Sequence, residues 1–149
     1  LGNLIQTPDA MYSPVNYLAV LVAGLLPMLI GSFWYGPLFG KKWMTLMGKT
    51  EEELRASFNP AKSYGVTFVF ALILAYMMAH VLGAWNDAYD VTGAMTGIQG
   101  AFWMWLGFVV TISWQQVAFS DQKVSLWILN ILYNLVSLMA MGALLGSWN

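Results

Sequence analysis

The chain has 149 residues, of which 59% are hydrophobic and 9% are charged, whereas soluble domains carry about 25% charged residues. The net charge of −1 argues against a nucleic-acid partner, which requires a basic surface. The absence of cysteine and the presence of a single histidine exclude disulfides, thiolate catalysis, Cys-ligated metals and a multi-histidine metal site within one chain.

The chain begins with a mixed segment, residues 1–12, which we expect to be an exposed lead. Met11 is a natural start site. Ser13 and Pro14 then read as a helix N-cap followed by proline at the first helical position. The uncharged run that follows predicts a first membrane span over about 14–40, kinked at Pro27 because proline lacks a backbone donor.

Residues 41–59 carry most of the charge. Thr50 and Glu53 have the spacing of a capping box, and Glu51 is one helical turn before Arg55. The segment predicts one or two short amphipathic helices at the membrane interface. Asn59 followed by proline again predicts the start of a helix.

Three further uncharged runs predict spans over about 61–85, 92–119 and 123–147. The connector at 86–90 is short and acidic. Four spans of this length predict an all-α membrane protein. We expect residues 13–149 to form a single antiparallel four-helix transmembrane domain.

The basic residues all lie on one side of this topology, namely Lys41, Lys42, Lys49, Arg55, Lys62 and Lys123. The positive-inside rule then places connectors 40–60 and 120–124 in the cytoplasm and both termini outside. We expect a multi-pass protein of a cytoplasmic membrane, which is the bacterial inner membrane if the family resemblance given next holds.

Several segments resemble the DUF1761 family of small bacterial membrane proteins. They are NYLAVLVA at 16–23, WYGPLFGKKWM at 34–44, TEEEL at 50–54 and the final helix at 130–148. The resemblance implies four spans and supplies no activity or catalytic residue.

Polar residues within the spans are expected to find partners or to line wet space, because an unpaired polar group is costly in lipid. Counting from the span ends places several at similar depth in the cytoplasmic third. We predict one polar cluster from Tyr35, Thr111, Gln115, Gln116, Asn130 and Asn134. It either fixes the bundle by interhelical hydrogen bonds or lines a hydrophilic cavity.

His80 is the one ionisable histidine within a span, and Gln99 is expected at a similar depth. The pair suggests a proton site or a ligand to haem or a chlorophyll-type pigment. The alternative is an interfacial histidine that is hydrogen-bonded or reaches toward the headgroups. No metal site is predicted, and bound lipid is the expected non-protein partner.

Small residues recur four apart, a spacing that lets membrane helices approach closely. These helix-packing candidates are Gly36 and Gly40, Gly93 and Gly97, and Gly142 and Gly146. Trp103 and Trp105 lie toward the middle of the third span, where at least one is expected to face lipid or another subunit.

Motifs of enzymes are absent from the sequence, so we predict no catalytic residue. The first functional hypothesis is a structural or accessory subunit that self-associates or joins a larger membrane complex. The alternative is a small oligomeric transporter or channel with an intramembrane polar cavity. A pigment- or haem-binding subunit that uses His80 is the third.

Overall fold

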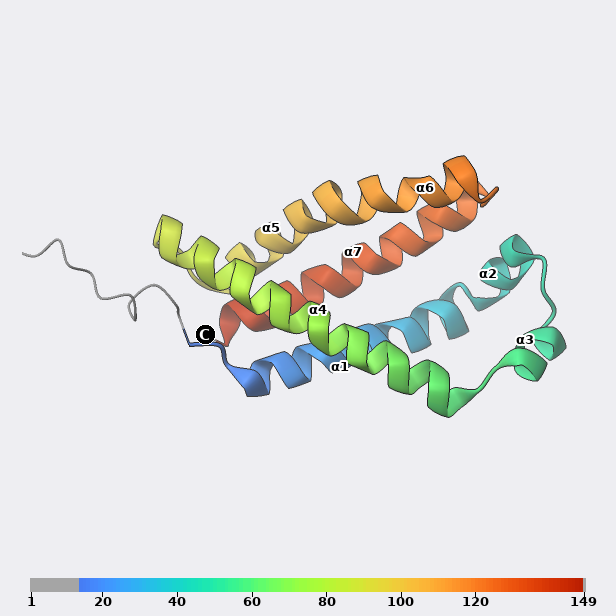
Figure 1. Ribbon diagram of the computed structural model, residues 1–149, viewed down its shortest axis with the longest axis horizontal. Helices are drawn as coiled ribbons and strands as arrows, with labels where there is room; N and C mark the ends of the chain where they lie inside the picture. The colour runs from blue at the N-terminus through green and yellow to red at the C-terminus, as the bar shows by residue number, and fades with distance from the viewer. Residues whose placement is uncertain (1–13, 149) are drawn as a thin grey trace, which may run out of the picture.

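The computed structural model describes residues 14–148, and these residues form helices without any strand. The predicted lead 1–12 and the predicted cap Ser13 lie outside the described residues. Figure 1 shows the long helices running side by side, with the short helices α2 and α3 at one end of the bundle.

Helix α1 spans Tyr17–Phe33 and begins later than predicted. Asn16 is its N-cap, and the side-chain oxygen accepts a hydrogen bond from the backbone N–H of Ala19 at 3.1 Å. The predicted start at Pro14 is therefore wrong. The Asn16 amide nitrogen also donates to the carbonyl of Trp148 at 3.0 Å, which ties the two ends of the described chain together.

The backbone of the first span breaks near its end. α1 continues through Pro27, and a π-helical turn, η2, follows over Trp34–Leu38. Within it Gly36 has φ −106° and ψ −107°, outside the helical region. The cause is the next residue, Pro37, whose ring disfavours the α conformation in the residue before it. The helical geometry is thus lost at Gly36, whereas the chain stays helical through Pro27, where the sequence predicted a kink.

Gly36 and Gly40 do not bring two helices together, which corrects the packing role expected for them. A Cβ added at Gly36 would meet no atom within 4 Å, and one added at Gly40 would meet the backbone of Tyr35. The lack of a side chain at Gly36 and Gly40 instead allows the break in the helix. Gly40 begins helix α2, which spans Gly40–Met47.

Helix α3, Glu51–Ser57, confirms the predicted capping box. The Thr50 hydroxyl accepts from the Glu53 N–H at 3.2 Å, and the Glu53 carboxylate accepts from the Thr50 N–H at 2.8 Å. Arg55 pairs with Glu51 at 2.5 Å. The connector between the first two spans therefore contains two short helices.

Helix α4 spans Pro60–Tyr89, and Asn59 caps it by accepting from the Lys62 N–H at 3.1 Å. The helix runs past the predicted end at Trp85. It stops where Asp90 adopts the left-handed conformation, with φ 51°. The acidic connector predicted at 86–90 is therefore largely helical.

The third span is built of helix α5 (Ala94–Met104), a π-helical segment η3 (Trp105–Val110) and helix α6 (Thr111–Phe119). The fourth is helix α7, Val124–Ser147. Two tryptophan side chains form hydrogen bonds between the third span and α7. The Trp105 Nε1–H donates to the Ile131 carbonyl at 2.7 Å, and the Trp127 Nε1–H donates to the Ser113 hydroxyl at 2.9 Å.

Helix α7 is central to the bundle and packs against both α5 and α1, while α1 also packs against α4 (Figure 1). The largest fully buried side chains are Met78, Leu82, Met141 and Leu145. They lie in the second half of α4 and the second half of α7. The core is therefore densest at the end of the bundle where the described chain begins and ends.

Glycines let α5 and α7 meet backbone to backbone at this end. A Cβ on Gly97 would overlap the carbonyl oxygen of Gly142, and one on Gly146 would overlap the carbonyl of Gly93. The Gly93 N–H donates to the Gly146 carbonyl at 3.1 Å. We call these four residues the glycine contact.

Within residues 14–148, four helical stretches are long and apolar enough to cross a membrane, namely Tyr17–Leu38, Pro60–Tyr89, Ala94–Phe119 and Val124–Ser147. They confirm the predicted all-α fold with four span-like helices.

We expect Gly97→Ala to destabilise the protein by about 1–3 kcal/mol, because the added methyl group overlaps the Gly142 backbone and forces α5 and α7 apart. The matched control is Gly65→Ala on α4, where an added Cβ meets nothing within 4 Å. That change should stabilise the helix by up to about 1 kcal/mol. Equal unfolding free energies of the two variants in detergent would contradict the glycine contact.

Candidate functional site

One polar pair joins the first and fourth spans inside the bundle. The Tyr35 hydroxyl, on η2, donates to the Asn130 side-chain oxygen on α7 at 2.8 Å. Asn130 lies on the second turn of α7, and the π-helical turn η2 sets Tyr35 beside it. The structure thus brings together two members of the predicted polar cluster.

A cavity of about 400 Å³ surrounds this pair. We call it the polar chamber, because four amide- or hydroxyl-bearing side chains from α6 and α7 line it in addition to the pair. Its lining residues are Tyr35, Trp43, Ser113, Gln116, Trp127, Asn130, Ile131, Tyr133 and Asn134.

A second cavity, of about 600 Å³, lies between the first span and the beginning of α4. We call it the aromatic chamber, since ring side chains from α2, α4, α7 and the α3–α4 link surround it. Its lining residues are Pro27, Met28, Gly31, Ser32, Tyr35, Gly36, Trp43, Phe58, Ser63, Tyr64, Thr67 and Tyr133.

Three rings belong to both chambers and form the wall between them. The Tyr35 ring lies edge-on to Trp43 at 5.3 Å and to Tyr133 at 5.1 Å between centroids. The Tyr133 hydroxyl donates to the Pro27 carbonyl at 2.7 Å, so the wall is anchored to α1. Edge-to-face contacts of this kind hold aromatic rings in defined orientations.

Tyr133, Trp43 and Ser113 were not among the predicted site residues. The sequence signal for Tyr133 and Ser113 is spacing: Tyr133 lies three residues after Asn130, and Ser113 lies three before Gln116. Residues three apart share a helix face.

Two predicted members of the polar cluster lie outside both chambers. Thr111 is exposed, and its hydroxyl donates to the Gly107 carbonyl of its own helix at 2.6 Å. Gln115 is also exposed. It precedes Gln116 by one position, which turns its side chain about 100° around the helix.

His80 and Gln99 occupy the other end of the bundle. The half-buried His80 ring lies edge-on to Tyr76, with ring centroids 4.5 Å apart and an interplanar angle of 84°. Gln99 is exposed on α5. Among residues 14–148 no group of three or more His, Asp or Glu side chains could hold a metal ion.

The two mid-span tryptophans differ, as their spacing suggested. Trp103 is 57% exposed on α5, whereas Trp105 is bonded to α7 as described above. Trp103 therefore faces outward from the single chain.

Four apolar helices around internal chambers define a small multi-pass helical membrane protein. The chain belongs to the DUF1761 family: the family described as "Protein of unknown function (DUF1761)" matches residues 18–146. Comparison with curated proteins and with solved structures gave no match.

We expect Tyr35→Phe and Asn130→Leu to be coupled in a double-mutant cycle by about 0.5–1.5 kcal/mol, since each removes the same interhelical hydrogen bond. Unfolding in mixed micelles measures the coupling. Tyr35→Phe combined with Thr96→Val on α5 provides the additive control. Additivity of the first pair would show that the bond contributes nothing to the bundle.

Proposed function

We propose that this chain is the subunit of a small oligomeric transporter, with the polar chamber as part of its solute pathway. The observation that carries the proposal is that both chambers lie at the end of the bundle that bears α2 and α3. Tyr35 lies on their shared wall and bonds Asn130 in the polar chamber, while the glycine contact closes the other end. A pathway open to one side and closed to the other fits one state of alternating access.

The lining chemistry fits binding rather than catalysis. Amides and hydroxyls line the two chambers, and no Asp, Glu, His, Lys or Arg side chain does so. Such groups supply hydrogen bonds to a passing solute and no general acid or base at neutral pH.

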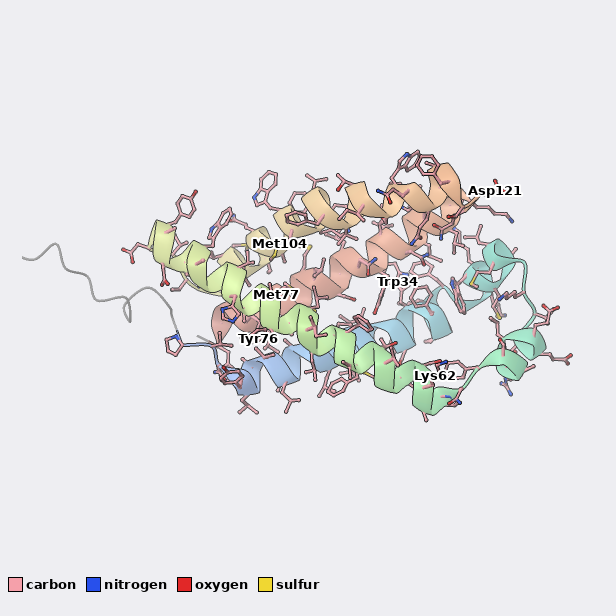
Figure 2. All side chains as sticks on the ribbon, viewed as in Figure 1. Trp34, Lys62, Tyr76, Met77, Met104 and Asp121 are labelled. Carbon is pink, nitrogen blue, oxygen red and sulfur yellow. The ribbon has the colours of Figure 1, made fainter. Side chains whose placement is uncertain are left out.

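The chambers are proposed to open toward the cytoplasm of a bacterium, across the inner membrane. Figure 2 places Lys62 and Asp121 at the same end of the molecule, which is also the end that bears α2 and α3. Lys41, Lys42 and Lys49 belong to that end, whereas Asp87 and Asp90 belong to the opposite one. The excess of basic residues supports cytoplasmic connectors and external termini.

A cysteine-accessibility experiment tests the transporter proposal, and the natural chain contains no cysteine to interfere. In oriented vesicles, Asn134→Cys should react with a membrane-impermeant thiol reagent from the cytoplasmic side. A fraction should also react from the outside, as alternating access requires. Ala101→Cys, at a side chain that is 0% exposed, is the control and should stay unlabelled.

Lack of reaction at Asn134→Cys from either side would mean that the polar chamber is dry. Reaction from the cytoplasmic side alone, even after long exposure, would mean that the chamber never opens outward. Either result would overturn transport.

The second candidate is an accessory subunit that joins itself or another membrane protein. It is favoured by the amides of Gln99 and Gln115, which are exposed on the outer surface of the third span together with Trp103. Amides on a lipid-facing surface are satisfied by hydrogen bonds to a neighbouring helix.

The mass of the particle extracted from native membrane in mild detergent separates the two candidates. A transporter subunit should be recovered as a homo-oligomer without other chains. An accessory subunit should be recovered with other membrane proteins in a fixed ratio. A monomer that binds neither itself nor a partner would contradict both.

A further inference from the structure

The aromatic chamber differs chemically from the polar chamber. Its walls carry five aromatic rings and no charged side chain. A ligand inside it would find neither a counter-ion nor enough polar groups to replace the hydration shell of a charge, so burying a charged group there would be costly. The volume of about 600 Å³ lies within the range of roughly 300–1,000 Å³ of small-molecule sites.

Hydrogen-bond donors lie on one wall of this chamber. Ser63, Tyr64 and Thr67 project from the first two turns of α4, and their hydroxyls make no hydrogen bond within residues 14–148. Ser63 and Thr67 are four residues apart and therefore share a face.

The hydroxyls on the facing wall are already used by the protein. The Ser32 hydroxyl donates to the Met28 carbonyl at 2.8 Å, and the Tyr133 hydroxyl donates to the Pro27 carbonyl at 2.7 Å. The hydroxyl donors that remain for a ligand thus come from α4, opposite a wall of rings.

The chamber opens to the outside of the bundle between α1 and α4. Tyr64 is 51% exposed, and Ser32 and Thr67 are also exposed on either side of the opening. Thr67 lies about 10 Å along α4 from its first residue. With α4 crossing the membrane, the opening lies in the half of the bilayer on the side of α2 and α3. A lipid-soluble molecule can therefore enter from the bilayer.

We propose that the aromatic chamber binds an uncharged, planar ring that carries carbonyl acceptors, the chemistry of a quinone. The ring packs against Tyr35, Trp43 and Tyr133, and its carbonyl oxygens accept hydrogen bonds from the Ser63 and Thr67 hydroxyls. The inference adds a class of solute to the transporter proposal, bound beside the polar chamber across the wall of Tyr35, Trp43 and Tyr133, and it rests on that proposal for the direction of movement. The same ring chemistry occurs in membrane quinones with a hydrocarbon tail and in small water-soluble quinones.

The test is saturable quenching of tryptophan fluorescence by decylubiquinone, measured with the whole chain in lipid nanodiscs. Thr67→Val keeps the side-chain shape and removes one donor, so it should weaken binding about five- to tenfold. Tyr64→Phe measures how much the Tyr64 hydroxyl of α4 contributes to the affinity. Thr67→Trp should fill the chamber and abolish saturable binding. Thr96→Val, a threonine on α5 that bonds its own helix, is the matched control and should bind as the natural chain does.

Two further ligands define the chemistry. Decylbenzene, which keeps the ring and tail without carbonyls, should compete at least about tenfold more weakly. Duroquinone, which lacks the tail, should bind equally well if the natural ligand is a small quinone, and poorly if it is a membrane quinone.

Absence of saturable quenching, or equal affinity of the natural chain, Thr67→Val and Thr67→Trp, would overturn the quinone proposal. If quinone does not bind but Asn134→Cys is labelled from the outside, the protein transports another solute. Quinone binding without outward labelling would leave a binding protein that does not transport.

Discussion

The close contact of two helix backbones at the glycine contact is the constraint on which the rest of the bundle depends. Because side chains are absent at Gly97 and Gly142, α5 and α7 approach until backbone meets backbone. In lipid such contact is stabilised by van der Waals packing, since hydrophobic burial gives no advantage over lipid tails. The bond between Asn16 and the Trp148 carbonyl closes the same end from the side of α1. At the other end larger side chains, among them Tyr35 and Tyr133, lie between the first and fourth spans.

The separated end would be unstable in a membrane if its polar groups were left unpaired, because lipid offers no hydrogen bonds. In the structure, polar side chains pair with each other and aromatic rings fill the space between the helices. Tyr35 and Asn130 satisfy each other, and the rings of Trp43 and Tyr133 divide the remaining space into two chambers. Amides line the polar chamber, and rings and hydroxyls line the aromatic chamber. This division is what links the fold to the proposed handling of an amphiphilic solute.

The sequence predicted the four spans, the capping box at Thr50 and the nearness of Tyr35 to Asn130, because apolar length, caps and depth along a helix are local properties. Rotation about the helix axis is not local. It separates Gln116, which lines a chamber, from Gln115, which does not. Tyr133 escaped prediction since its role depends on reaching the Pro27 carbonyl, far away in the chain. The sequence predicted a kink at Pro27 and not the break at Gly36, because a proline in mid-span is a local signal, whereas the break lies where the first span ends beside α7.

Pulsed electron resonance on pairs of spin labels tests the central claim, that the glycine contact fixes one end while the other is free to separate. One pair, at Met95 and Ser147, reports on the fixed end, and a second pair, at Thr67 and Gln116, reports on the chambers; all four side chains are exposed. The account predicts a narrow distance distribution for the first pair and a broad or divided one for the second. A distribution for the first pair as broad as that for the second would contradict it.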